Sequence, residues 1–184
     1  MTKKSKQNYS GIFGGHVVIE NVNGKSVVDI PEKVKPKREP TPGQLQVQER
    51  FKLAFGYAKN AMTNPELYAL YNAKATKDCF AYKWAVKDYL RPPRITVIDT
   101  TDYHGVTGDK IIVLASDCVK VVSVSIRIIG ADGNLIEEGL CQLDTVAANY
   151  EYTATNQVQS LTGIKIVARV KDTPGNRTEM SCLL

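Results

Sequence analysis

The regular alternation of apolar and polar side chains in residues 119–129 limits the folds open to this chain more than any other feature. The alternating residues are Val122, Ser123, Val124, Ser125, Ile126, Arg127 and Ile128. Successive side chains of a β-strand point to opposite faces, so the pattern predicts a strand with one buried and one wet face. A helix needs a period near 3.6 residues, which this segment lacks.

Several further short β-prone runs surround this strand, separated by turn residues such as Gly130-Ala-Asp-Gly133. The predicted strands are 95–98, 110–115, 119–129, 135–139, 150–153, 164–170 and 178–183. About seven short strands with turns between them are typical of an antiparallel β-sandwich. Because no helix alternates with these strands, a parallel sheet is not expected. We therefore predict a β-sandwich domain over residues 92–184.

The preceding segment, residues 41–91, carries helical signals. Thr41-Pro-Gly-Gln44 matches a capping box with proline at the first helical position. Apolar residues then recur every three or four positions from Val47 to Met62, as an amphipathic helix requires. Asn64-Pro65 predicts the start of a second helix, and residues 79–90 a third. Pro92-Pro93 ends the region, since proline cannot continue a helix.

The first forty residues predict an extended arm. Two β-prone runs, residues 16–20 and 25–30, flank Asn23-Gly24, which is a strong hairpin signal. Residues 31–40 hold three prolines and four Lys/Arg, so they read as an extended linker. A two-stranded hairpin is not stable alone, so the arm must lie on its own domain or on a neighbouring subunit. The predicted partner-binding residues are Phe13, His16, Val18, Lys33, Lys35, Lys37 and Arg38.

Charge divides the chain into unlike halves. Residues 1–90 hold 15 Lys/Arg and 8 Asp/Glu, whereas residues 91–184 hold 9 and 11. A basic front half could attract nucleic acid or an acidic protein surface. The run from Lys33 to Arg38 lacks interleaved aromatic residues, however, so a solvated linker is the favoured interpretation.

The sequence predicts neither a targeting segment nor a cysteine motif for redox chemistry or metal binding. No stretch is long and apolar enough to predict a membrane span, and the N-terminus has no apolar segment typical of a secretory signal peptide. The four cysteines, at positions 79, 118, 141 and 182, include no Cys-x-x-Cys pair. We expect reduced thiols without a metal, although one disulfide across the sandwich is an alternative.

Candidate chemistry is sparse. The chain has only two histidines, His16 and His104, and no nucleophile–base set can be assembled around them, so we expect neither an enzyme nor a cofactor. Aspartates at predicted strand ends could supply the oxygen ligands of a calcium ion. These weak calcium candidates are Asp99, Asp102, Asp109, Asp117 and Asp172. Turn aspartates more often accept hydrogen bonds from their own backbone, which is the favoured alternative.

The C-terminal ninety residues resemble bacterial immunoglobulin-like domains. The matching segments are Ile98-Asp99, Tyr103-His-Gly105, Gly108-Asp109-Lys-Ile, Ala115-Ser-Asp117, Val122 to Ile128, Asp132-Gly133, Tyr152-Thr153-Ala154 and Ala168-Arg-Val-Lys-Asp172-Thr-Pro-Gly175-Asn176. The last segment has one extra residue before the aspartate compared with the family pattern. The resemblance implies an immunoglobulin-like sandwich and is nearly silent about function, because this fold has many unrelated roles.

The front half is similar to the opening of uncharacterised proteins from Bacteroidetes and their phages. The matching residues are Thr41, Gln44, Gln48-Glu-Arg50 and Phe51, with Phe51 closer to Arg50 than in the looser family spacing. The whole chain is thus expected to be an α+β multidomain protein with an arm (1–40), a helical region (41–91) and a sandwich (92–184).

This organisation leads to a functional hypothesis. We expect a non-enzymatic structural protein of a large assembly, namely a bacteriophage virion component (capsid, neck or tail) assembled in the bacterial cytoplasm. Its partners would be other protein subunits, in a homo- or hetero-oligomer. Two alternatives stay open: a cell-envelope module that binds glycan or protein, and a nucleic-acid-associated protein that uses the basic front half.

Overall fold

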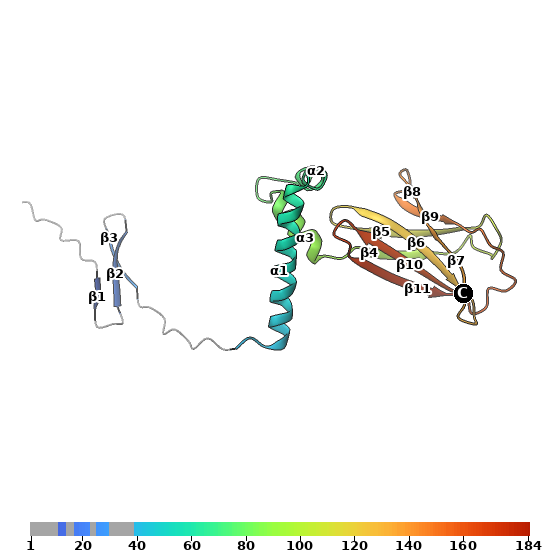
Figure 1. Cartoon of the computed structure of the whole chain (residues 1–184), viewed down its shortest axis with the longest axis horizontal. Coiled ribbons are helices and arrows are strands. Elements are labelled where there is room, and N and C mark those ends of the chain that lie inside the picture. Colours follow the sequence, from blue (N-terminus) through green and yellow to red (C-terminus); the bar gives the residue numbers. More distant parts are fainter. Residues whose placement is uncertain (1–10, 14–16, 23–24, 30–38) are drawn as a thin grey trace, which may run out of the picture. The chain divides into compact units, whose positions relative to one another are not determined.

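The computed structural model describes residues 11–13, 17–22, 25–29 and 39–184, with side chains described from residue 39 onward. The chain divides into two compact units, Met1–Thr41 and Pro42–Leu184. Figure 1 shows the elements in chain order. The observed class is α+β, with three helices and two antiparallel four-stranded sheets in the second unit.

The first unit contains a three-stranded antiparallel sheet in the order β1-β2-β3. β2 (Val17–Val22) and β3 (Lys25–Asp29) are the two strands predicted around Asn23-Gly24, with Val22 opposite Lys25. β1 (Gly11–Phe13), which pairs with β2, was not predicted. The arm therefore has one strand more than the hairpin we expected.

Three helices open the second unit. α1 (Pro42–Thr63) begins at the predicted proline. α2 (Pro65–Asn72) is capped by Asn64, whose side-chain oxygen accepts hydrogen bonds from the backbone N–H groups of Glu66 and Leu67. α3 (Ala81–Leu90) starts two residues later than predicted, after Phe80, which provides no side-chain cap.

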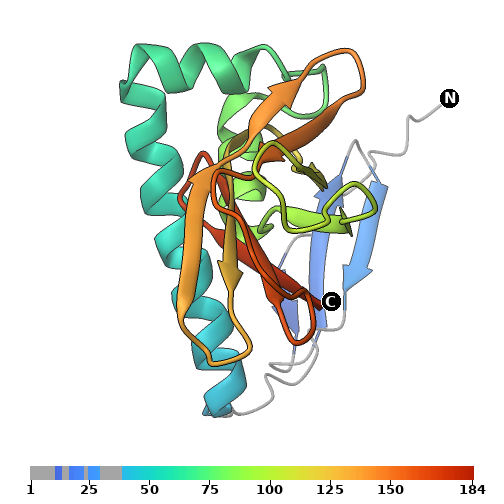
Figure 2. The ribbon, with the colours of Figure 1, turned by 90° about the vertical axis from the view of Figure 1, so that its right-hand side faces the viewer.

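The helices pack through a small core rich in alanine. Its buried members are Ala58, Ala61, Tyr71, Ala81 and Ala85. Alanine at the crossing lets two helix backbones approach closely. Near the start of α1, the Arg50 guanidinium donates to the carbonyl of Leu90 at the end of α3 (2.7 Å). Near the end of α1, Ala61 shares the core with Ala81 at the start of α3. The two helices therefore run antiparallel. Figure 2 shows α2 turning away from the end of α1.

The β region, residues 94–184, consists of two four-stranded sheets. One has the order β4-β5-β9-β8 and the other β11-β10-β6-β7. The strands are β4 (Arg94–Asp99), β5 (Lys110–Ser116), β6 (Val121–Ile129), β7 (Leu135–Leu140), β8 (Gln142–Asp144), β9 (Asn149–Thr153), β10 (Lys165–Asp172) and β11 (Arg177–Leu183). All seven predicted strands are present, and the short β8 is an addition.

One apolar core joins both sheets of the β region. Its members come from β5, β6, β9, β10 and the adjoining loops, and they include Ile111, Val113, Val124, Ile126, Ile128, Tyr152, Ile166, Ala168 and Val170. The alternation that predicted β6 holds for Val124, Ile126 and Ile128, which are buried while their polar neighbours are partly exposed, but Val122 is 53% exposed. Within the described residues, no helix is long and apolar enough to cross a membrane.

Candidate functional site

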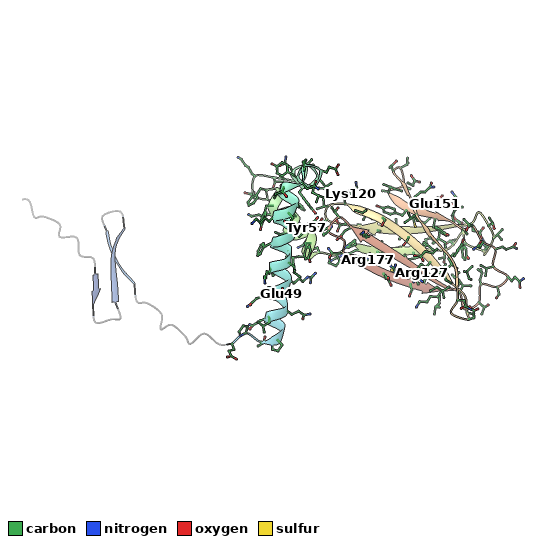
Figure 3. All side chains as sticks on the ribbon, viewed as in Figure 1. Glu49, Tyr57, Lys120, Arg127, Glu151 and Arg177 are labelled. Atoms are coloured by element: carbon green, nitrogen blue, oxygen red, sulfur yellow. The ribbon has the colours of Figure 1, made fainter. Side chains whose placement is uncertain are left out.

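A buried chain of hydrogen bonds runs through the helical region to the side chain of Asp88. Asp88 lies on α3 and is fully buried, as is Tyr71 on α2. The Tyr71 hydroxyl donates to Asp88 Oδ2 (2.8 Å). Since this bond uses the Tyr71 proton, the Tyr57 hydroxyl is the donor in its 2.7 Å contact with Tyr71. One side chain from each helix therefore takes part (Figure 3 labels Tyr57).

Side chains of the β region complete this buried cluster. The Cys118 thiol donates to Asp88 Oδ1 at 3.1 Å. Asp117 accepts hydrogen bonds from the Val119 and Lys120 N–H groups through Oδ2, while its Oδ1 is buried without a partner. Ligand atoms of Asp88, Asp117 and Cys118 lie within 4.8 Å of one another. The turn after β5 is thus joined to α3 by polar contacts.

Asn176, in the turn between β10 and β11, makes a second connection to α3. Its side-chain amide donates to the carbonyls of Asp88 (3.3 Å) and Tyr89 (3.2 Å), and to Asp172 Oδ2 (2.7 Å). The fully buried Asp172 accepts two further bonds from the backbone N–H groups of Gly175 and Asn176. These bonds hold the helices and the β region together as one unit.

Burial sets the protonation of this cluster. Removal from water raises the pKa of Asp88 to about 7, even though its hydrogen bonds from Cys118 and Tyr71 favour the charged form. Burial also raises the pKa of the Cys118 thiol to about 12, and the Asp88 carboxylate adds to that shift. The nearby Asp117 carboxylate adds to the rise in the pKa of Asp88.

Among the residues that the structure describes, Asp88, Asp117 and Cys118 also lie close enough together to hold a metal ion. Both oxygens of Asp88 already accept hydrogen bonds, however, and a thiol with a raised pKa resists becoming the thiolate that binds metals. We therefore describe the cluster as a hydrogen-bonded junction. An open surface hollow of about 650 Å³ lies beside it, lined by Arg91, Arg94, Asp117 and Cys118 among others.

The predicted calcium candidates do not gather at one end of the β region. Asp99 and Asp109 lie at one end of β5, where they accept backbone hydrogen bonds from Thr101, and from His104 and Val106, respectively. Asp102 is exposed in the same connection. Asp117 and Asp172 lie at the other end of β5, near α3. Four of the five accept hydrogen bonds from nearby backbone N–H groups, as in the Asx-turn alternative.

Most of the predicted partner-binding residues fall outside the described part of the chain. His16, Lys33, Lys35, Lys37 and Arg38 are among them. Phe13 and Val18 belong to β1 and β2, of which only the backbone is described. All four cysteines are described, and no disulfide joins them in the structure.

A second candidate site is an exposed apolar surface on α1. Every residue from Pro42 to Leu53 is exposed, although five large apolar side chains lie on the helix up to Phe55. Val47, Phe51 and Phe55 are 55%, 43% and 48% exposed, and the two phenyl rings lie 6.1 Å apart. They follow one another at four-residue spacing, so they share one side of the helix. We call these three residues the Phe51 face.

The three-and-four spacing from Val47 to Met62 predicted that the residues of the Phe51 face share the apolar side of an amphipathic helix. The structure agrees with the spacing and leaves this part of the apolar side exposed. Sequence reasoning missed Asp88 as a site residue, because a single aspartate on a predicted helix resembles a solvated charge. The one available signal was that Asp88 lies three residues after Ala85, on the apolar side of α3.

No protein-family model matches this chain, and no curated protein sequence matches it.

Proposed function

We propose that the protein is a non-enzymatic structural component of a large assembly, attached through its arm and helices. The observation that carries this proposal is the exposed first half of α1. Contiguous apolar surface on a folded protein marks an interaction site more often than chance. The exposed stretch of α1, residues 42–53, is also of about the length at which an isolated helix is marginal in water, so a partner on its apolar side would stabilise it. The buried cluster at Asp88 has a sufficient role as a junction, so it requires no catalytic interpretation.

We further propose that the β region is an immunoglobulin-like sandwich. Support comes from the strand order, since β4-β5-β9-β8 and β11-β10-β6-β7 correspond to the ABED and GFCC′ sheets of that fold. The shared core between the sheets is consistent with face-to-face packing. In this proposal the β region is the part that projects from or bridges the assembly, and the arm and the helices are the parts that attach it.

The more specific proposal is a bacteriophage virion component in the capsid, neck or tail. Its support is the combination of an arm that forms its own unit, an exposed helix and a β region that resembles immunoglobulin-like domains. Arms and exposed elements of this kind join subunits by strand addition or by helix packing.

Density-gradient sedimentation of lysates from cells that make the tagged chain tests the proposal. We expect the full chain in a fast-sedimenting particle, and a chain without residues 1–40 at monomer mass. Electron microscopy of the fast fraction then identifies a virion. If the full chain sediments as a free monomer throughout particle production, the proposal is wrong.

A further inference from the structure

The Phe51 face continues a line of residues that already packs against a helix. Val47, Phe51, Ala54, Ala58 and Ala61 follow at spacings of four, three, four and three along α1. Such spacing keeps one seam of a helix against a partner helix. The last three residues of this line are buried, with 0–1% exposure, where α3 lies against α1.

The seam is covered along only part of its length. α3 ends at Leu90, beside Arg50, and the chain then leaves through Pro92-Pro93 into β4. Within residues 39–184 no helix lies over the Phe51 face, and Figure 1 shows the first turns of α1 extending past α3. The exposed part of the seam thus has the geometry of a helix-packing surface that lacks a second helix.

Charge identifies the kind of helix that fits. Neighbours in an α-helix lie about 100° apart, so Arg50 and Lys52 lie on the two sides of Phe51. Lys59, seven residues after Lys52, extends one of these sides. Glu49 is two positions before Phe51 and points away from the face. The apolar line is therefore bordered by positive charge on both sides.

These positive charges disfavour two partners for the Phe51 face that the protein itself could provide, namely a second copy of the chain and its own arm. A second copy would bring its own Arg50 and Lys52 against the first pair. The arm is also basic, with 8 Lys/Arg and 4 Asp/Glu in residues 1–41. Like charges along a helix seam select against pairing, whereas opposite charges set partner choice.

We propose that the Phe51 face binds an acidic amphipathic helix of another protein, whose apolar line is bordered by Asp and Glu. This inference rests on the proposed role as an assembly component and names the chemistry of the partner. The bound helix would continue the line of α3 along α1. Its carboxylates would pair with Arg50 and Lys52, and its apolar side chains would cover Phe51 and Phe55.

Two synthetic peptides of about four heptads test the proposal against the full chain. Both carry Leu at the a and d positions; one has Glu and the other Lys at every e and g position. Fluorescence anisotropy should show that the Glu peptide binds at least about tenfold more tightly than the Lys peptide, and that added salt weakens this preference.

Matched variants localise the binding. Phe51→Gln with Phe55→Gln should abolish binding of the Glu peptide, whereas Leu45→Gln with Leu53→Gln, at 51% and 53% exposed positions off the face, should leave it unchanged. Lys52→Glu keeps the apolar residues and should remove most of the preference between the peptides. Circular dichroism of each variant confirms that α1 is retained.

Three outcomes overturn the proposal: neither peptide binds, both bind equally, or the chain self-associates in analytical ultracentrifugation through Phe51 and Phe55. The last result would assign the face to a second copy. None of them affects the sedimentation test of the proposed function, so the two can fail separately.

Discussion

The β region and the helical region bury their apolar residues to very different extents. In the β region, β-branched side chains from two sheets close over one another, and the largest of them, such as Ile111, Ile126 and Ile166, have no exposed surface. In the helical region the fully buried apolar residues are mostly alanines, and the phenylalanines of α1 remain exposed. The β region has a closed core of large side chains, although single apolar residues such as Leu140, Val146 and Leu183 are exposed on it. In the helical region the core is thinner, and three exposed apolar residues share one side of α1.

The two regions also differ in the hydrogen bonds that their polar side chains make. Most side-chain hydrogen bonds of the β region are local turn contacts, such as those of Asp99 and Asp109. The helical region depends instead on a buried acid and its partners, Tyr71 and Cys118. The junction of the two regions, where Asp88 and Asp172 are buried and have raised pKa values, should therefore respond to pH.

Ile126→Ala should give the largest effect on stability. The side chain is fully buried between the sheets, and its loss leaves a cavity in a closed core, so we expect the free energy of unfolding to fall by about 3–4 kcal/mol. Urea titration measures the change. Val122→Ala, at a 53% exposed position of the same strand, is the control and should cost much less. Similar losses for both variants would contradict a closed core.

Asp88 should contribute strongly to the pH dependence of stability, and the fully buried Asp172 should add to it, because burial raises the pKa of both carboxyl groups. The native state holds the Asp88 proton up to a pH of about 7, whereas the unfolded chain releases it near the ordinary aspartate pKa of 3.8. The stabilisation is therefore complete below that lower value and is lost as pH rises through the native pKa. We expect the free energy of unfolding to fall by about 2 kcal/mol between about pH 4.5 and about pH 8.

Asp88→Asn tests this assignment, because the amide stays neutral across the whole range. Its unfolding free energy should vary much less with pH, while Asp78→Asn, on an exposed residue before α3, should follow the unmodified chain. The turn aspartates Asp99, Asp109, Asp132 and Asp144 have lowered pKa values, so their effect lies at more acidic pH. An unchanged pH profile in Asp88→Asn would exclude Asp88 as the cause.

Asn176→Ala should have a smaller effect, located at the junction. The substitution removes the amide donor to the Asp88 and Tyr89 carbonyls and to Asp172, so we expect a loss of about 1–2 kcal/mol. Hydrogen exchange should show faster opening of α3 than of β10. Arg177→Ala, on the exposed next residue, serves as the control. Equal acceleration in both elements would mean that the bonds do not act at the junction.

Phe51→Gln with Phe55→Gln should change the stability of the free protein least. Both side chains are exposed, so the unfolding free energy should shift by less than about 0.5 kcal/mol. Thermal unfolding followed by circular dichroism measures this. A large loss would mean that these residues belong to a core within the chain, and the difference between the two regions would disappear.

Local sequence signals predicted the elements of the second unit well. The helix starts at Pro42 and Pro65 follow from capping chemistry, and seven of the eight strands from alternation and turn residues. β8 escaped prediction because three residues are too few to establish a period. β1 also escaped prediction, because glycine is a poor indicator of strands.

The sequence by itself determined the period of each segment, since an alternating or three-four pattern depends only on neighbouring residues. It determined that Val47, Phe51 and Phe55 share one side of a helix. Only the tertiary structure decided which apolar faces are covered, because burial depends on residues far away in the chain. α3 covers Ala54 to Ala61 and ends before Val47, and β10 and β11 bring Asn176 to α3. Such long-range proximity placed Asp88 inside the protein and left Phe51 outside.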